Sequence, residues 1–256
     1  MQKFKLINQK IPPDAFVYFK NNGYLLLEDV IDNEEVSIIN NKIDELILIE
    51  KKNKTIFEYG ENLTRIWNLV NKDLLFQNLI TSAYILEFAD YAFDRDTNHL
   101  KYYLSSFQAN ILGPGAKAQS LHIDTPVPDP LPSWEIKINS IWLLNDFTDK
   151  NGATQIIPQS HKFGRRPNKN NVNDYEGLVD VIAKKGSVLF TSGYLWHRSG
   201  NNLTSIDRRV LLGSFAASYM REISSEEDIL SFQAKNNIVP IQNKCWELVG
   251  GLHGIK

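Results

Sequence analysis

The sequence predicts an α+β, mainly β, fold: a double-stranded β-helix (a cupin-like jelly roll) with N-terminal helices packed on one sheet. Three observations predict it. The first hundred residues carry mostly helical patterns, the residues after His99 carry short strand patterns, and no repeat or clear linker divides the 256 residues. Helices followed by many short strands favour an α+β architecture, and eight or so strands in two sheets form a jelly roll.

We therefore expect one domain over residues 1–256, with a helical part at about 1–99, a core at about 100–220 and a tail at 221–256. In the helical part, a Pro-Pro-Asp run opens a helix that Asn22-Gly23 ends, and an extended piece follows. Asp32 and Glu35 form a plausible capping box before apolar residues at helical spacing. The expected helices span 12–22, 32–49 and 73–93, and the extended piece spans 24–30.

The core is expected to consist of short strands separated by turns. Residues 135–145 alternate apolar and polar side chains, the pattern of a half-buried strand. A loop at 125–133 holds four prolines, and the tail is expected to pack as a helix and an end segment. The expected strands span 100–112, 119–123, 135–145, 154–157, 178–183, 187–191 and 208–219.

Composition bounds the partners. The net charge is -2 without a long run of one sign, which gives no support for nucleic-acid or anionic-membrane binding. No apolar run approaches the ~20 residues of a membrane span, and no secretory signal is recognised. The single cysteine, Cys245, excludes an internal disulfide and is expected to be a buried apolar filler. We expect a cytoplasmic protein with a small-molecule substrate and no nucleic-acid or membrane partner.

One histidine pattern points to chemistry. Among five histidines, only His122 has a carboxylate two positions later, at Asp124; His197 follows 73 residues after Asp124, and Arg208 a further eleven. Residues i and i+2 of a strand face the same side, so His122 and Asp124 can enter one cavity. The third ligand must then come from a strand across that cavity. His-x-Asp with a distant His is the ligand set of the facial-triad iron oxygenases.

The later arginine fits the same chemistry. Three protein ligands leave three positions on Fe(II), which a chelating 2-oxo acid and O2 can fill. The distal carboxylate of the acid then needs a fixed cation, and the planar fork of arginine can pair with it bidentately. By itself, however, the His-x-Asp pair arises by chance about as often as not in such a composition. The alternative is a partly buried His122 with Asp124 capping the proline-rich loop.

Five segments carry a resemblance to a known family. They are FKNNGYLLLEDVIDNEEV, GPGAKAQSLHID, IWLLNDFTDKNGATQIIPQSH, KKGSVLFTSGYLWHRSGNN and DRRVLLGSF. In order and spacing they resemble the phytanoyl-CoA dioxygenase family of Fe(II)/2-oxoglutarate oxygenases, across almost the whole chain. Two departures touch turns only: Gln159 stands where the family has glycine in its PGSH motif, and Gly186-Ser187 stands where it has Gly-Asp.

The resemblance implies a role for each matching residue. It implies that the catalytic iron ligands are His122, Asp124 and His197. It implies that Arg208 binds the distal carboxylate of 2-oxoglutarate, with Arg209 as the alternative because adjacent strand residues face opposite ways. Gln119 and Thr154 match positions that bind the co-substrate, and Asn68 matches a less certain position near the site; plain loop or turn roles stay open for them. His161 is expected to support its loop rather than bind metal.

The implied cofactors are Fe(II), 2-oxoglutarate and O2, and the implied activity is hydroxylation of a small organic molecule. Desaturation, epoxidation and ring formation are alternatives. The substrate could be an amino acid, a natural-product intermediate or an acyl group, including one bound to CoA or a carrier protein. We expect loop 125–134, segment 55–68, Trp142 and Trp196 near the substrate, with plain core roles equally open for the tryptophans. The competing function is a metal-binding jelly roll without oxidative chemistry, either a zinc-type hydrolase or isomerase or a binding module.

Overall fold

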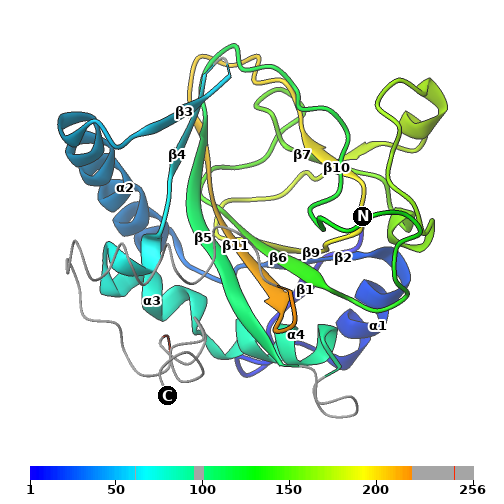
Figure 1. Cartoon of the computed structure of the whole chain (residues 1–256). Helices are drawn as coiled ribbons and strands as arrows, with labels where there is room; N and C mark the ends of the chain where they lie inside the picture. The colour runs from blue at the N-terminus through cyan, green and yellow to red at the C-terminus, as the bar shows by residue number, and fades with distance from the viewer. Residues whose placement is uncertain (61, 95–100, 221–244, 246–256) are drawn as a thin grey trace.

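Two β-sheets form the centre of the protein (Figure 1). The computed structural model describes residues 1–60, 62–94, 101–220 and 245. Within them, an eight-stranded sheet has the order β1-β2-β9-β6-β11-β5-β4-β3, and a three-stranded sheet has the order β10-β7-β8. The large sheet comprises β1 (Phe4–Lys5), β2 (Tyr24–Glu28), β9 (Val188–Ser192), β6 (Lys137–Leu143), β11 (Arg208–Ala217), β5 (Tyr102–Leu112), β4 (Leu63–Ile66) and β3 (Phe57–Tyr59). The small sheet comprises β10 (His197–Ser199), β7 (Thr154–Ile156) and β8 (Val179–Asp180).

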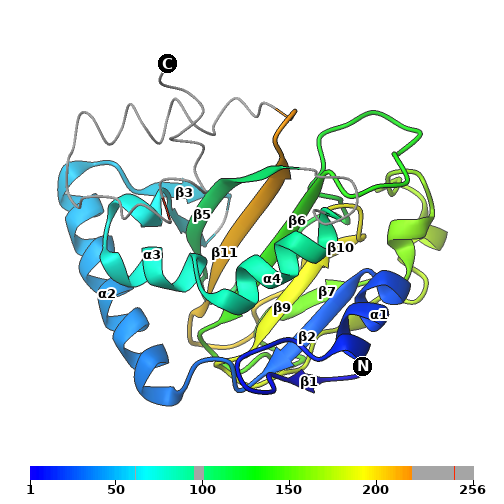
Figure 2. The same ribbon diagram turned by 90° about the horizontal axis from the view of Figure 1, so that it is seen from below.

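Helices cover one face of the large sheet, as the view in Figure 2 shows. They are α1 (Pro13–Asn22), α2 (Asn33–Asn53), α3 (Leu74–Ile80) and α4 (Ala83–Ala92). Between them and the sheet lies the main hydrophobic core, where Phe88 of α4 stacks on Phe190 of β9 with ring centroids 4.0 Å apart. A second core lies between the two sheets and contains Leu26, Leu143, Phe147, Ile156 and Leu189. The helices thus bury one face of the sheet, and the small sheet covers part of the other.

The central strands divide their side chains between these two faces. On β5, Phe107, Ala109 and Ile111 enter the core under the helices. The alternate residues Asn110 and Leu112 therefore face the space between the sheets, because successive side chains of a strand point to opposite sides. The same alternation runs along β6 and β11. The polar side chains of these strands that face away from the helices therefore gather in the space between the two sheets.

Local sequence explains where α1 ends and where α2 begins. Asp32 accepts a hydrogen bond from the Glu35 amide at 2.8 Å, and the Glu35 carboxylate accepts one from the Asp32 amide at 3.0 Å. This capping box satisfies two amides at the start of α2 that have no partner within the helix. Gly23 ends α1 at φ +80°, a conformation that glycine adopts without steric cost. Both expected boundaries are confirmed.

Three details differ from the sequence-based expectations. The expected helix at 73–93 is two helices, broken where Ser82 begins α4. The expected strand at 119–123 is an extended segment joined to the small sheet by one bridge, between His122 and His197. The N-terminal hundred residues also contain β1, β3 and β4, which are too short to give a periodic pattern.

The expected helix and tail at 221–256 lie outside the described residues, except for Cys245, which is buried without a disulfide partner. The one-domain organisation over residues 1–256 therefore stays a prediction. No helix in the described ranges is both long and apolar enough to span a membrane.

Gln159 shows why one family motif favours glycine. It adopts φ +67°, the left-handed conformation that β-carbon sterics disfavour. The next residues form the turn Ser160–Lys162, in which His161 Nε2 donates to the Lys20 carbonyl at 3.1 Å. The glycine replacement therefore strains a turn but leaves its geometry in place. His161 supports this turn, as expected, and does not approach the three candidate ligands.

Candidate active site

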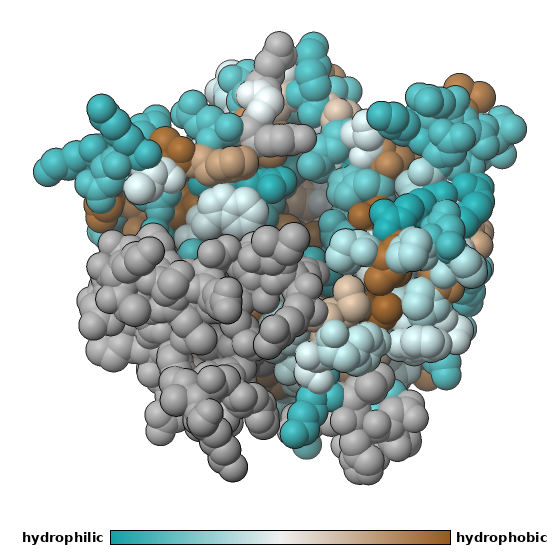
Figure 3. Space-filling model, in the orientation of Figure 1, coloured by the Kyte–Doolittle hydropathy of each residue, from teal (hydrophilic) through white to brown (hydrophobic). Residues whose placement is uncertain are grey.

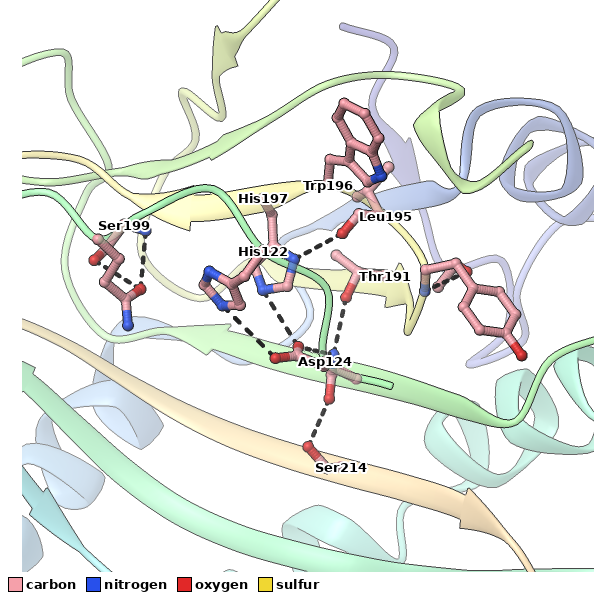
Figure 4. Close-up of polar contacts among 12 residues, drawn as sticks. His122, Asp124, Thr191, Leu195, Trp196, His197, Ser199 and Ser214 are labelled. Atoms are coloured by element: carbon pink, nitrogen blue, oxygen red, sulfur yellow. Dashed lines mark hydrogen bonds and ion pairs between the residues drawn. The ribbon is translucent and has the colours of Figure 1, made fainter. Parts of the chain in front are cut away.

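Backbone pairing brings the three candidate metal ligands together. His122 and His197 exchange two backbone hydrogen bonds of 3.0 Å, so their imidazole rings lie side by side with centroids 4.5 Å apart. The Asp124 amide donates to the Gly193 carbonyl at 3.1 Å. This bond holds the backbone of Asp124 so that its carboxylate faces the two imidazoles. One potential ligand atom from each of the three side chains lies within 4.8 Å of the others. Figure 4 shows the Asp124 carboxylate below the two rings, with a contact to each of them.

The hydrogen bonds of the histidines select one tautomer. His122 Nδ1 donates to the Ser120 carbonyl at 2.8 Å, and His197 Nδ1 donates to the Leu195 carbonyl at 2.9 Å. A carbonyl oxygen can only accept, so each Nδ1 carries hydrogen and each Nε2 presents its lone pair. Both Nε2 atoms face Asp124, at 3.8 Å from Oδ1 for His122 and 3.2 Å from Oδ2 for His197. This donor set of two imidazoles and one carboxylate fits Fe(II).

The electrostatics of the cluster also suit a cation. Burial works to raise the pKa of Asp124, but the two imidazoles hold it well below its usual range. Burial and the neighbouring His197 lower the pKa of His122. Burial opposes the charged form of His197 as well, but the Asp124 carboxylate outweighs it and raises the pKa of His197. The carboxylate therefore stays ionised, and a divalent cation can replace the proton that it favours on His197.

A row of polar side chains on the large sheet supports the Asp124 carboxylate. Asn139 Nδ2 donates to Asp124 Oδ2 at 2.6 Å, and Ser214 Oγ donates to Asn139 Oδ1 at 2.5 Å (Figure 4). Thr191 Oγ1 lies 3.3 Å from the same Asn139 nitrogen. Register explains the row, because Ser214, Asn139 and Thr191 are direct partners across β11, β6 and β9. All three are buried, so the Asp124 carboxylate has one supported orientation.

A cavity of about 110 Å³ connects the three ligands to Arg208. Arg208 is buried and donates from Nε and Nη2 to the Gly152 carbonyl at 3.1 and 2.8 Å. Its guanidinium lies 5.1 Å from the ring centroid of Phe147. No carboxylate of the described ranges forms an ion pair with it. Burial lowers the pKa of Arg208 to about 10, so it remains charged near neutral pH.

The neighbouring arginine points the other way. Arg209 Nη2 lies 2.8 Å from Asp44 Oδ1 on α2 and 3.5 Å from Asp207 Oδ2. Arg209 thus already has counterions on the face of the sheet that the helices cover, opposite the cavity. Strand alternation leaves Arg208 as the arginine that faces the cavity.

The structure brings two further predicted residues to this cavity and leaves one out. Gln119 and Thr154 both line it. Gln119 Oε1 accepts from the Ser199 amide and hydroxyl at 3.1 and 3.0 Å, which leaves the Gln119 amino group as a donor for a ligand. Asn68 instead begins the short helix Leu69–Asn71 at φ +56° and does not line the cavity. Arg65, three residues earlier on β4, lines it instead.

The expected aromatic walls have other surroundings. Trp142 is fully buried in the core under the helices, against Phe107. Trp196 packs with Leu121 and Ile157 and carries Arg165 over its ring. Both tryptophans are therefore core residues, which is the plain alternative that the sequence left open.

An arginine fixes the proline-rich loop that follows Asp124. Arg166 Nη2 donates to the carbonyls of Thr125 and Val127, and the Arg166 amide donates to Asp129 Oδ1 at 3.1 Å. Prolines have no amide hydrogen, so a loop rich in them must be held through its carbonyl and side-chain oxygens. This contact holds the loop that begins at a candidate ligand.

A partly buried acid, Glu135, supports the turn that bonds to Asp124. Ser192 Oγ donates to Glu135 Oε2 at 3.0 Å, and the adjacent Gly193 carbonyl accepts from the amides of Asp124 and Thr125 at 3.1 Å each. Burial raises the pKa of Glu135 to about 7. The Ser192 hydroxyl and the Gly193 backbone act in the opposite direction but do not offset burial.

Several site residues had no signal in the sequence. Ser199 could have been found, because it lies two positions after His197 and must share its strand face. The others reach the site through cross-strand register, which a single sequence does not reveal. They are Arg65, Asn110, Asn139, Thr191 and Ser214.

Comparisons with known proteins agree with this geometry. The sequence model of the family described as phytanoyl-CoA dioxygenase (PhyH) matches residues 19–210. Dioxygenase af480 of Aspergillus fumigatus is 34% identical over 140 residues, which is 54% of this chain. The match spans 45% of the relative's own length, so the chain covers under half of that protein.

Two solved structures share the fold. One is a non-heme alpha-ketoglutarate-dependent carbocyclase, SnoK, from nogalamycin biosynthesis, with a TM-score of 0.66 and 17% identity over 81% of this chain and 85% of that chain. The other is HygX from Streptomyces hygroscopicus with nickel, 2-oxoglutarate and hygromycin B bound, with a TM-score of 0.64 and 17% identity over 84% of this chain and 92% of that chain. These similarities confirm the predicted jelly-roll fold class.

Asn139→Leu is expected to weaken divalent-metal binding about 10- to 100-fold, because it removes the hydrogen bond that orients Asp124. The dissociation constant for Co(II) can be measured by anaerobic titration with its visible absorption. Ser140→Ala is the matched control, since Ser140 lies on the same strand but bonds to the Gly213 carbonyl on the opposite face. Wild-type affinity in a folded Asn139→Leu protein would contradict the orienting role.

Glu135→Gln is expected to stabilise the protein more at pH 8 than at pH 5. Between the ordinary carboxyl value of 4.5 and about 7, the unfolded chain loses this proton while the folded chain keeps it. Wild-type stability therefore falls as pH rises through that window, by about 1–3 kcal/mol in total. Glutamine keeps the acceptor for Ser192 and cannot ionise. Thermal unfolding at both pH values, with the exposed Glu176→Gln as control, tests this; a difference independent of pH would contradict it.

Proposed function

The chain belongs to the phytanoyl-CoA dioxygenase family of Fe(II)/2-oxoglutarate-dependent dioxygenases, and from this premise we propose that it hydroxylates a small organic molecule. Membership rests on a match over residues 19–210, well over half of the chain. The family and enzyme class expected from the sequence are thereby confirmed. The residue roles, the reaction outcome and the substrate are our proposals.

The proposed metal ligands are His122, Asp124 and His197. Their Nε2 atoms and carboxylate converge, and backbone carbonyls fix both ring orientations. Together with 2-oxoglutarate and O2, bound Fe(II) supplies the oxidising power to attack an unactivated C–H bond. The protein's own contribution is to keep Asp124 ionised, direct the Nε2 atoms of both imidazoles toward the metal position and limit access of water.

The observation that carries the proposal is Arg208. It is a buried cation without an acidic partner among the described residues, and one cavity joins it to the three ligands. Burying an unpaired charge costs considerable free energy, so such a group is expected to meet an anionic ligand. The distal carboxylate of 2-oxoglutarate meets that need at one end of the cavity while its keto acid reaches the metal at the other. A zinc-type hydrolase would leave Arg208 without a role.

Gln119, Thr154 and Ser199 are proposed to complete the co-substrate site. All three line the same cavity. The Gln119 amino group and the Thr154 hydroxyl are uncharged donors that can bind carboxylate oxygens. Asn68 is not retained in this role, since Arg65 of the same segment lines the cavity in its place.

Hydroxylation is proposed because of Asp124. A carboxylate ligand occupies the position that chloride would need in a halogenating enzyme, so the product should carry new oxygen. Desaturation, epoxidation and ring formation remain alternatives of the same site. A natural-product intermediate, an amino acid or an acyl group is the proposed substrate. Two proteins of similar fold support a small natural product, because SnoK belongs to nogalamycin biosynthesis and HygX was solved with hygromycin B bound.

The function is tested by loss of metal and turnover in two variants. His122→Ala and His197→Ala should each abolish Fe(II)-dependent conversion of 2-oxoglutarate to succinate, because each removes one of three protein ligands. Co(II) titration should show the same loss independently of turnover. His161→Ala is the control, since that imidazole bonds to the Lys20 carbonyl away from the site. Full succinate formation in both ligand variants would refute the assignment.

Arg208→Ala should raise the KM for 2-oxoglutarate roughly 10- to 150-fold, the effect of losing a charge-assisted pair worth about 1.5–3 kcal/mol. The measurement is succinate formation against 2-oxoglutarate concentration. Arg209→Ala is the matched control, because it removes the neighbouring guanidinium on the face that the helices cover. The reverse result, with the defect in Arg209→Ala alone, would show that the facing assignment is inverted.

A further inference from the structure

Two amides on β5 lack the hydrogen bonds that buried amides require. Neither Gln108 nor Asn110 makes a side-chain hydrogen bond to any part of the chain that the structure describes, and both side-chain oxygens are buried. Gln108 is only 4% exposed. Nearly all buried polar groups in proteins are paired, so two neighbouring exceptions call for an explanation.

One amide lines the active-site cavity, and the other lies next to it on the same face of β5. Asn110 lines the cavity that holds the metal ligands and Arg208. Gln108 is two residues away on the same strand and therefore on the same face. Its direct partner on β11 is Leu212, which also lines the cavity. The wall thus runs along β5 from Asn110 to Gln108, away from the strand end where Leu112 pairs with Arg208.

An apolar side chain would be more stable at such a position. A buried amide without a partner forfeits its hydration, whereas leucine or methionine of similar size would not. Natural proteins retain such local costs chiefly at functional sites. The two amides therefore have the properties of groups that await a ligand.

We propose that Gln108 and Asn110 bind the organic substrate, and that this substrate carries a hydroxyl or amide group near the carbon that is oxidised. A carboxamide offers both a donor and an acceptor, and hydroxyl and amide groups match both. The co-substrate matches poorly, because 2-oxoglutarate only accepts hydrogen bonds and its distal carboxylate is assigned to Arg208. A plain hydrocarbon chain would leave both amides unpaired. This inference rests on the proposed function and specifies its substrate class.

Stability gives the first test. Gln108→Met should unfold at the same temperature as the wild type or higher, because no hydrogen bond is lost. Gln77→Met is the matched control and should unfold at a lower temperature, since the Gln77 amide is equally buried but donates to the Val70 carbonyl at 2.8 Å. A fall in the unfolding temperature of Gln108→Met comparable to that of the control would overturn the proposal, because the amide would then be structural.

Binding gives the second test, with N-methylacetamide and propane-1,2-diol as probes. Protein loaded with Mn(II) and 2-oxoglutarate should enhance the proton relaxation of both probes, and Gln108→Met or Asn110→Leu should weaken their apparent binding about tenfold, the effect of one lost hydrogen bond. Gln77→Met should behave as the wild type does. Unchanged probe relaxation in both β5 variants would overturn the proposal.

The affinity for 2-oxoglutarate distinguishes a failure of this inference from a failure of the proposed function on which it rests. Gln108→Met should leave the dissociation constant of 2-oxoglutarate within about twofold of the wild type, because the hydrogen bonds at stake belong to the substrate. If Gln108→Met weakened 2-oxoglutarate binding and left probe binding unchanged, the two amides would belong to the co-substrate site. That result would overturn this inference but not the proposed function. Failure of the wild-type protein to bind Mn(II) and 2-oxoglutarate would instead refute the proposed function.

Discussion

The paired backbone bonds between His122 and His197 are the constraint on which the site depends. They join an extended segment that is not part of either sheet to the edge of the small sheet. This single bridge fixes the separation of the two imidazoles and sets which way the segment between Ser120 and Asp124 is turned. The Gly193 carbonyl then fixes the far end of that segment. Two short contacts thus place three side chains from positions far apart in the sequence.

Charge distribution follows from the same arrangement. The cavity lining includes one acid, Asp124, beside the imidazoles of His122 and His197 and three arginines, Arg65, Arg198 and Arg208. Burial makes each of these charges costly unless it meets an opposite charge. In the proposed site, a divalent metal would offset the charge of Asp124, and a dianionic co-substrate would offset part of the positive charge of the metal and of the lining arginines. Bound metal would therefore favour co-substrate binding, and bound co-substrate would favour metal binding.

The sequence predicted those parts of the site that depend on local spacing. The i and i+2 rule placed His122 with Asp124, and strand alternation left one of two adjacent arginines facing inward. It could not predict Asn139, whose contact with Asp124 depends on how β6 and β11 align. Asn68 does not line the cavity, whereas Arg65 on the preceding strand does, and neither position could be read from spacing alone. The strand expected at 119–123 is present only as one bridge to β10, between His122 and His197.

The alternation of side chains along β5, β6 and β11 has a consequence for evolution. Every second residue belongs to the core under the helices, and the residues between them face the chamber. Substitutions at the chamber-facing positions can therefore alter which molecules fit without disturbing the packing between the sheet and its helices. A lineage built on this scaffold can diversify its chemistry one side chain at a time. An inserted residue, by contrast, would exchange the two sets unless a bulge absorbed it, as happens on β5 opposite Ser214 and Phe215.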